Sequence, residues 1–280
     1  MDHLEKNALK EKCQYIRYLI ADQIGTLGFG HIGGSLSIVE ALVVLYYKQM
    51  NIDPQNPKKE GRDRFIMSKG HAGPALYAVL ADKGYFGKEL LHTLNKPGTT
   101  LPSHTDMKLT PGVDMTAGSL AQGFSCAVGI AYGSRLNNDG AYTYVMLGDG
   151  ESQEGQVWEA AMCAAQHKLD RLIAFTDYNK LQLDGWVENI SDLAPLADKW
   201  RAFRWNVTEL ADGHDLEAIE NAITNAKKNK GKPTMIILHT IKGKGLSLCE
   251  SNMIGSHSMT ITAEQHRQAL AELKGGVSLA

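Results

Sequence analysis

The sequence predicts an α/β protein with a mostly parallel sheet that is flanked by helices on both faces. After residue 140, short apolar stretches alternate with helical patterns, whereas the first 140 residues are mostly helical in pattern. Strands separated by helices are typical of a parallel sheet, because each parallel strand needs a long crossover before the next. Strands are expected at 142–147, 172–177, 206–210 and 234–239, and helices at 154–168, 196–203 and 215–228.

The first 140 residues predict four helices. The first, 9–24, has five apolar residues on one face at helical spacing. A second is expected over 35–49 with Ser35 as its N-cap, and a third over 74–83. The fourth, 119–137, is rich in Gly, Ala and Ser, which implies close packing against a neighbouring backbone or a ligand.

The composition describes an ordinary globular protein. Of 280 residues, 43% are apolar and 21% charged, and the net charge is -2 with a pI near 6.6. This balance gives no electrostatic reason to expect nucleic acid or an acidic membrane as a partner.

Cysteine usage and the N-terminus predict a soluble cytoplasmic protein. The four cysteines are widely separated and form no C-x-x-C pair, which argues against a zinc knuckle, a redox motif or a disulfide framework. The N-terminal stretch MDHLEKNALKEK is charged and lacks the apolar region of a signal peptide. The run IVEALVVLYY is interrupted by Glu40 and is too short to span a bilayer.

The stretch VMLGDGESQEG predicts a metal and phosphate site. A strand-like run ends at Gly148, Asp149 and Gly150, which alone would be an ordinary turn. Ligands of parallel sheets, however, bind beyond the carboxyl ends of the strands, and Asn179 follows the end of the next strand. The Asp149 carboxylate, the Asn179 amide and a carbonyl near Leu181 are the oxygen ligands that Mg²⁺ prefers. The glycines and the N-terminus of the following helix would admit a diphosphate.

Several motifs resemble the transketolase family. GDG followed by 28 residues and then Asn179 is similar to the thiamine diphosphate motif, which opens with GDG and closes on Asn. Four further segments resemble transketolases in order and spacing: GHIGGSLSIVEAL from Gly30, DRFIMSKGHAGPALYAVL from Asp63, LPSHTDMKLTPGVDMTAGSLAQGFSCAVGIA from Leu101, and IGSHSM from Ile254. The resemblance runs from about Ala21 to the last helix and implies a thiamine diphosphate-binding fold.

The resemblance also implies thiamine diphosphate and Mg²⁺, or Ca²⁺ or Mn²⁺, as cofactors. The metal ligands would be Asp149, Asn179 and the Leu181 carbonyl. The expected contacts to the cofactor are His71, Gly150, His257 and Asn179 near the diphosphate, the Gly118 main chain at the aminopyrimidine, and Leu120 and Leu183 at the thiazolium ring.

Three histidines and one glutamate match catalytic positions of the family. His31 and His104 match histidines that face the substrate, and His257 joins them; imidazole suits proton transfers to sugar hydroxyls near neutral pH. Glu154 matches a carboxylate that links active sites across a subunit interface. Each histidine alone would be a turn or surface residue, and Glu154 alone a helix N-terminal acid. Their matching glycine- and serine-rich contexts favour a site.

The chain is much shorter than single-chain transketolases. Those enzymes continue into a second domain, which carries the glutamate that activates the aminopyrimidine, and a third domain. The resemblance therefore implies that 1–280 is a single diphosphate-binding domain, the N-terminal subunit of a split transketolase. It would be inactive alone and would need a C-terminal subunit that carries the catalytic glutamate, in an α2β2 heterotetramer. The pair would move a two-carbon ketol unit from a ketose phosphate to an aldose phosphate.

Departures near the sugar pocket leave the substrate open. GHIGGS replaces the commoner GHPGA, AGSL replaces TGPL, and the loop from His104 to Gly118 is slightly longer. The sugar is either an ordinary pentose-pathway phosphate or an unusual branched, deoxy or sulfonated one. Three alternatives remain: another thiamine diphosphate enzyme (deoxyxylulose-phosphate synthase or a 2-oxo acid dehydrogenase component), an inactive regulatory paralogue, and a nicotinamide enzyme. The last is disfavoured because no G-x-G-x-x-G follows a first strand.

Overall fold

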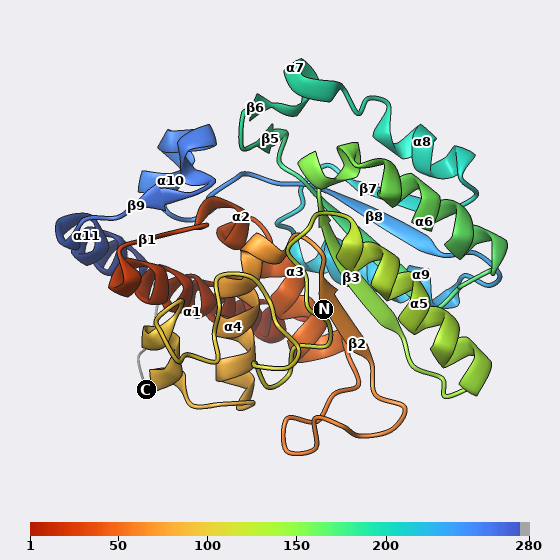
Figure 1. Ribbon diagram of the computed structural model, residues 1–280, viewed down its shortest axis with the longest axis horizontal. Helices are drawn as coiled ribbons and strands as arrows, with labels where there is room; N and C mark the ends of the chain where they lie inside the picture. Colours follow the sequence, from red (N-terminus) through yellow and green to blue (C-terminus); the bar gives the residue numbers. More distant parts are fainter. Residues whose placement is uncertain (275–280) are drawn as a thin grey trace.

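The protein, described here by a computed structural model over residues 1–274, has a five-stranded parallel sheet at its centre (Figure 1). The strands run in the order β2 (Arg64–Met67), β3 (Thr143–Gly148), β4 (Leu172–Tyr178), β8 (Thr234–His239) and β7 (Asn206–Leu210). Every neighbouring pair is parallel, and Gly148 lies opposite Asp177 where β3 and β4 end. The predicted α/β fold class is confirmed.

The sequence predicts four of these strands to within one residue at each end and misses β2. That strand has only four residues, RFIM, which is too short to display a period-2 pattern. Its place in the sheet comes from pairing with β3, since Arg64 to Met67 lie opposite Thr143 to Met146.

Helices cover both faces of the sheet, as expected. One core contains residues of α1 (His3–Leu27), α3 (Val39–Val44), α4 (Gly73–Lys83) and α9 (Leu216–Lys228), and the other contains residues of α5 (Gln122–Asn137), α6 (Gly155–Gln166) and α8 (Leu196–Ala202). Successive strand residues point to opposite faces, so Tyr144 and Met146 enter the first core and Val145 and Leu147 the second. Because both faces are buried, the central strands are almost wholly apolar.

Short elements complete the fold. They are β1 (Phe29–Gly30), paired with β9 (Met259–Thr260); the hairpin β5 (Leu181–Gln182) and β6 (Gly185–Trp186); helices α2 (Gly33–Leu36), α7 (Val187–Ser191), α10 (Ser247–Asn252) and α11 (Ala263–Lys274); the π-helix η1 (Leu45–Gln49); and the 3-10 helices η2 (Gly70–Ala72), η3 (Lys88–Thr93), η4 (Gly150–Gln153) and η5 (Met253–Ser256). Within residues 1–274, no helix is long and apolar enough to cross a membrane.

The continuous helix expected over 35–49 is wrong. Helix α2 already begins at Gly33, and Ser35 is not an N-cap, because its hydroxyl donates to the His31 carbonyl at 2.7 Å. The chain then leaves helical geometry at Ile38, with φ -109°, next to Ser37, whose hydroxyl donates to Asp177 at 2.7 Å. A polar contact to the end of β4 thus interrupts the helix.

The helix expected from 119 begins at Gln122 instead. Ala121 adopts a left-handed φ of 69°, and its N–H donates to the Glu151 carboxylate at 2.8 Å. This tertiary hydrogen bond, which no local sequence pattern indicates, replaces the first helical turn.

Candidate active site

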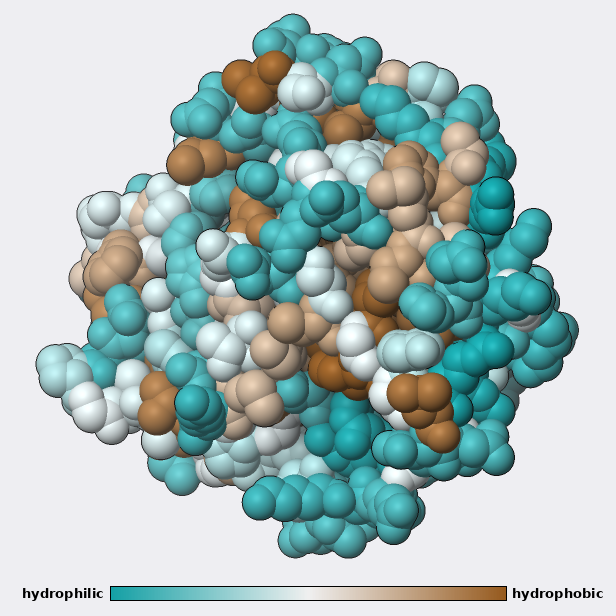
Figure 2. All heavy atoms as spheres, turned by 45° about the vertical axis from the view of Figure 1, so that its right-hand side comes forward, coloured by the Kyte–Doolittle hydropathy of each residue, from teal (hydrophilic) through white to brown (hydrophobic). Residues whose placement is uncertain are grey.

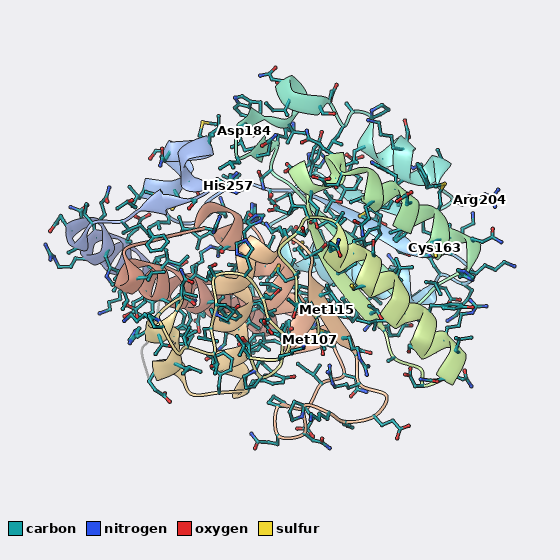
Figure 3. All side chains as sticks on the ribbon, in the orientation of Figure 1. Met107, Met115, Cys163, Asp184, Arg204 and His257 are labelled. Atoms are coloured by element: carbon teal, nitrogen blue, oxygen red, sulfur yellow. The ribbon has the colours of Figure 1, made fainter. Side chains whose placement is uncertain are left out.

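A cavity of about 430 Å³ opens at the carboxyl ends of β3 and β4, where parallel sheets bind their ligands. All of the site residues expected from the sequence line it: His31, His71, His104, Gly118, Leu120, Asp149, Gly150, Glu154, Asn179, Leu181, Leu183 and His257. They come from segments that span most of the chain; Figure 3 shows His257 on the segment after α10 and Asp184, another lining residue, in the β5–β6 hairpin.

Asp149 is a buried carboxylate at the floor of the cavity, with 3% of the residue exposed. It accepts hydrogen bonds from the Gly150 N–H at 2.7 Å and the Lys180 N–H at 2.5 Å. Burial, and then the neighbouring Asp177 carboxylate, raise its pKa to about 7 despite these bonds. A cation beside Asp149 would oppose both effects.

Asn179 and Leu181 present further oxygen atoms beside Asp149. The Asn179 amide donates from Nδ2 to Asp177 at 2.9 Å, and its Oδ1 accepts from the Leu181 N–H at 3.1 Å. This orientation directs the amide oxygen away from Asp177, and the Leu181 carbonyl accepts from Lys242 at 2.9 Å. Both residues line the cavity.

The three oxygen donors fit a hard divalent cation. A carboxylate, an amide oxygen and a main-chain carbonyl suit Mg²⁺ or Ca²⁺, which take the rest of their ligands from phosphate and water. Nowhere in residues 1–274 do three or more His, Cys, Asp or Glu side chains form a group that could hold a metal ion. A cation here would therefore depend on Asn179, Leu181 and oxygens from outside the chain.

Four histidines form one wall of the cavity. The His31 ring centroid lies 5.5 Å from that of His71, 5.6 Å from His104 and 5.4 Å from His257. Burial lowers the pKa of all four, to about 3 for His257 and well below the ordinary value for His71, and nearby cations or imidazoles add to the effect in all but His104. The imidazoles are therefore neutral near pH 7, and each can accept one hydrogen bond and donate another through its ring nitrogens.

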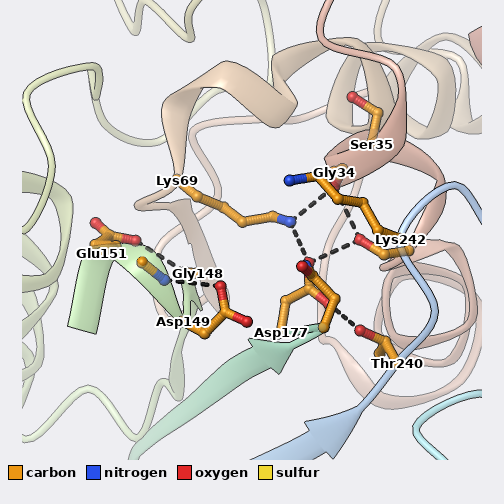
Figure 4. Close-up of polar contacts among 12 residues, drawn as sticks. Gly34, Ser35, Lys69, Gly148, Asp149, Glu151, Asp177, Thr240 and Lys242 are labelled. Atoms are coloured by element: carbon orange, nitrogen blue, oxygen red, sulfur yellow. Dashed lines mark hydrogen bonds and ion pairs between the residues drawn. The ribbon is translucent and has the colours of Figure 1, made fainter. Parts of the chain in front are cut away.

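Two buried lysines that the sequence analysis missed also face the cavity. Lys69 is 1% exposed and donates to the Gly34 carbonyl at 2.7 Å and to Asp177 at 2.5 Å (Figure 4). Lys242 donates to the Leu181 carbonyl and to Nδ1 of His257, the latter at 3.2 Å. Burial lowers the pKa of Lys242 to about 8. Their positions in SKGH and IKGKG were the only sequence signals.

Glu151 is a third missed residue, and it fixes the end of β3. Its carboxylate is fully enclosed and accepts from the Ser68 hydroxyl at 2.5 Å and the Ala121 N–H at 2.8 Å. It also accepts from the Gly148 N–H at 3.0 Å, and Figure 4 shows these two residues side by side. It thereby ties β2, the start of α5 and the GDG segment together. An acid directly after GDG gave no sequence signal that its side chain would be buried.

Comparisons with known proteins identify the family. Residues 8–274 match the family model described as "Transketolase, thiamine diphosphate binding domain". The chain belongs to the transketolase family. The predicted enzyme class, a transketolase, is confirmed as well, because relatives named as transketolase subunits match along nearly the whole chain.

Two such relatives are transketolase subunits for unusual sugars. The chain is 55% identical over 266 residues to the 6-deoxy-6-sulfo-D-fructose transketolase subunit SqwG of Clostridium sp. (strain MSTE9), covering 95% of this chain and 96% of the relative. It is 40% identical over 244 residues to an apulose-4-phosphate transketolase subunit of Phocaeicola vulgatus, covering 87% and 86%.

Solved transketolase structures share the fold but are longer. The structure of transketolase from Leishmania mexicana superposes with a TM-score of 0.88 at 31% identity and covers 95% of this chain. The chain spans only 41% of that enzyme. The fold and family expected from the sequence are thus confirmed, whereas the roles of the individual site residues stay predictions.

Two exposed leucines and an exposed glutamate line this cavity. Leu120 is 36% exposed and Leu183 58% exposed, although both line the cavity. Glu154, the residue before α6, is exposed and makes no side-chain capping bond. Gly150 keeps the wall close, because a Cβ there would lie 2.7 Å from Cβ of Gln182 on the hairpin.

Proposed function

We propose that this chain is the N-terminal subunit of a split transketolase, which uses thiamine diphosphate and Mg²⁺ to transfer a two-carbon ketol unit from a ketose to an aldose phosphate. The observation that carries the proposal is the cavity that gathers oxygen ligands, two buried ammonium groups and four neutral histidines at the ends of β3 and β4. Within this proposal, residues 1–280 are the diphosphate-binding domain, and the pyrimidine-binding and C-terminal domains belong to another chain.

The cofactor would be held through its charged end. Asp149, Asn179 and the Leu181 carbonyl would ligate Mg²⁺, while His71 and the Gly150 N–H would contact the diphosphate. The N-terminus of the short 3-10 helix at Gly150 and the Lys242 ammonium add positive potential on the same side. When bound, thiamine diphosphate supplies a carbon nucleophile and an electron sink.

The histidines would handle protons on the sugar. His31 and His104 present neutral imidazoles, which could take a proton from a sugar hydroxyl and return it, whereas His257, whose pKa burial lowers to about 3, is suited to donating a hydrogen bond to the sugar. Because these imidazoles are neutral, they would not compete with the metal ion for the negatively charged diphosphate oxygens. His257 already accepts a hydrogen bond from Lys242 at Nδ1, which leaves Nε2 as its protonated nitrogen.

A second subunit would close the cavity and supply the glutamate that activates the aminopyrimidine. Exposed Leu120 and Leu183 at the cavity mouth support this, because large apolar side chains at a rim favour docking. Apolar patches interrupt the hydrophilic surface on the face turned forward in Figure 2. An α2β2 heterotetramer would place Glu154 between active sites. The cytoplasmic location remains a prediction from cysteine usage.

For the substrate we propose 6-deoxy-6-sulfo-D-fructose as the ketose donor. The support is the 55% identity to a subunit named for that sugar, compared with 40% for a subunit named for apulose 4-phosphate. Both relatives match most of this chain, 95% and 87%, so the higher sequence identity to the first does not come from a shorter matched segment. An ordinary pentose-pathway donor is the competing substrate.

The test is ketol transfer to an aldose phosphate by this chain, by its presumed C-terminal subunit, and by the mixture, with thiamine diphosphate and Mg²⁺. We expect activity only in the mixture, and faster with 6-deoxy-6-sulfo-D-fructose than with xylulose 5-phosphate. Activity of this chain alone would refute the split arrangement. Preference for xylulose 5-phosphate would refute the donor, and decarboxylation of pyruvate would indicate a deoxyxylulose-phosphate synthase or 2-oxo acid dehydrogenase component.

A further inference from the structure

A tight turn after β8, residues 241–245, carries Lys242 into the cavity. Lys242 is only 4% exposed, and its ammonium reaches the Leu181 carbonyl at 2.9 Å and His257 at 3.2 Å. The turn itself bonds to the start of α2 through the Gly243 N–H and the Gly33 carbonyl, at 3.0 Å. The position of this ammonium therefore depends on what holds the turn from behind.

Three side chains behind the turn, two buried and His214 partly buried, form one network, which we call the Arg17–Glu40–His214 triad. Arg17 on α1 and His214, in the loop before α9, grip the two oxygens of Glu40 on α3, at 2.5 Å and 3.0 Å. Each also bonds the turn: Arg17 Nε donates to the Lys244 carbonyl at 2.8 Å, and the Ile241 N–H donates to His214 Nε2 at 2.9 Å. None of these bonds touches the cavity side.

The donors and acceptors of the triad fix one tautomer of His214. A backbone N–H can only donate, so Nε2 of His214 is the acceptor and Nδ1 carries the proton that Glu40 accepts. Burial would raise the pKa of Glu40, but Arg17 and His214 lower it below its ordinary value, so the carboxylate stays ionised and accepts from both partners. The ionised Glu40 thus determines which nitrogen of His214 faces Ile241.

The turn has little freedom to move independently of the triad. Gly245 has φ +85°, and a Cβ there would lie 2.7 Å from Cδ of Arg17. Gly243 has φ +82°, and a Cβ there would lie 2.5 Å from Cβ of Cys249. Only glycine allows the turn this close to both neighbours.

We propose that Arg17, Glu40 and His214 are positioning residues, which hold the 241–245 turn so that the Lys242 ammonium stands at the cofactor end of the cavity. The proposal rests on the proposed function for the identity of the ligand that Lys242 meets. The first part of the proposal, that the triad immobilises the turn, is independent of the proposed function.

The test uses two matched substitutions of His214 in the full chain. His214→Asn keeps an amide donor near the Nδ1 position but loses the acceptor for the Ile241 N–H, whereas His214→Gln places an amide oxygen near the Nε2 position. Hydrogen exchange of peptide 240–246 reads the turn directly, and titration of Mg²⁺ and thiamine diphosphate, with and without the presumed C-terminal subunit, reads the ligand affinity.

We expect His214→Asn to speed exchange in 240–246 and to raise the Kd for Mg²⁺–thiamine diphosphate, each about fivefold, the effect of one net hydrogen bond. His214→Gln should stay within about twofold of the wild type in both, since it restores that bond. Glu40→Gln should resemble His214→Asn, because an amide that accepts from Arg17 turns its NH2 group toward Nδ1 of His214, and the tautomer with a protonated Nε2 cannot accept from the Ile241 N–H. Arg17→Lys provides an independent test, as it loses the Nε bond to Lys244 while keeping the charge.

Asp82→Asn serves as the control for general destabilisation. Asp82 is a mostly buried carboxylate that binds Lys12 at 2.6 Å and Tyr47 at 2.5 Å and lies outside the cavity lining and the turn. It should lower thermal stability without changing exchange in 240–246 or the Kd.

Unchanged exchange in His214→Asn would overturn the proposal, and so would faster exchange with an unchanged Kd. If the wild-type chain bound no thiamine diphosphate even with its partner, the proposed function would fail. The exchange data would in that case still decide whether the triad holds the turn.

Discussion

Replacing Lys69 by methionine should lower the free energy of unfolding by more than the loss of hydrogen bonds to neutral acceptors does. Lys69 and Asp177 form an ion pair at 2.5 Å, with side-chain exposures of 2% and 0%. Methionine has nearly the same length and volume as lysine, so the change removes the charge and leaves little cavity. What remains is a buried carboxylate without its cation.

The expected magnitude follows from the partners that Asp177 keeps. Removing one member of a buried pair costs about 3–5 kcal/mol of the free energy of unfolding. Asp177 would still accept hydrogen bonds from Ser37, Thr240 and Asn179, which places the expected cost near the lower end, about 3 kcal/mol. An unfolding entropy of about 0.6 kcal/mol per kelvin for 280 residues turns this into a fall in Tm of about 5 °C.

Calorimetry in EDTA would measure Tm for K69M, D177N and the double variant. The double variant should be less destabilised than the sum of the single variants, because no unpaired charge remains buried. Lys227→Met is the control, since the Lys227 ammonium bonds the neutral acceptors of Gln49, at 2.8 Å and 2.9 Å, and forms no ion pair with a carboxylate within residues 1–274. If K69M melted no lower than Lys227→Met, the ion pair would be no stronger than ordinary hydrogen bonds and the reasoning would be refuted.

Three further predictions concern the cavity and its surroundings. Asp149→Asn should weaken Mg²⁺-dependent thiamine diphosphate binding by at least about 100-fold, which is the upper end of the range for substitutions beside a metal, and titration calorimetry would measure this. Asp63→Asn is the control, because it also alters a buried carboxylate that accepts from two backbone N–H groups, and it should leave the affinity unchanged. Gly70→Ala places a Cβ 2.5 Å from the Ala117 carbonyl oxygen and should lower stability by about 1–3 kcal/mol in a denaturant titration. Glu40 has a depressed pKa in the fold, so the stability that it contributes is present above its unfolded pKa and is lost as pH falls through the folded one. The difference in unfolding free energy between wild type and Glu40→Gln should therefore narrow as pH falls below the ordinary Glu pKa of 4.5, and a constant difference would contradict this assignment.

The sheet could be predicted from sequence because most of its strands are separated by clear helical patterns. The same reasoning missed β2, where four residues are too few to show a period, and misjudged the helix at 35–49. In the second case the local pattern is sound, but the contact from Ser37 to Asp177, far away in the chain, overrides it. Long-range hydrogen bonds of this kind leave no trace in helical periodicity.

The site residues that were predicted are those that lie in segments resembling the family's motifs. An aspartate between glycines at a strand end, or a histidine between glycine and alanine, stands out because of that match, since either residue alone would be an ordinary turn residue. Lys69, Lys242 and Glu151 do not, since lone charged residues in loops usually lie at the surface. Only the structure reveals that all three are buried and what each one bonds.

The charges around the cavity explain why a cation and a diphosphate suit it together. A cation alone would meet the Lys69 and Lys242 ammonium groups as well as Asp149, and a diphosphate alone would meet the carboxylates of Asp149 and Asp177. Each ligand relieves the repulsion that the other would feel, and the neutral histidines add no charge to either side. Burial raises the pKa of Asp149 to about 7 and lowers that of Lys242 to about 8. In both groups it disfavours the charged form, and a bound ligand of opposite charge would favour that form again. If the proposed function holds, the cavity would bind the two ligands cooperatively, and the proposed role of the Arg17–Glu40–His214 triad is to maintain this balance by holding the turn that carries Lys242.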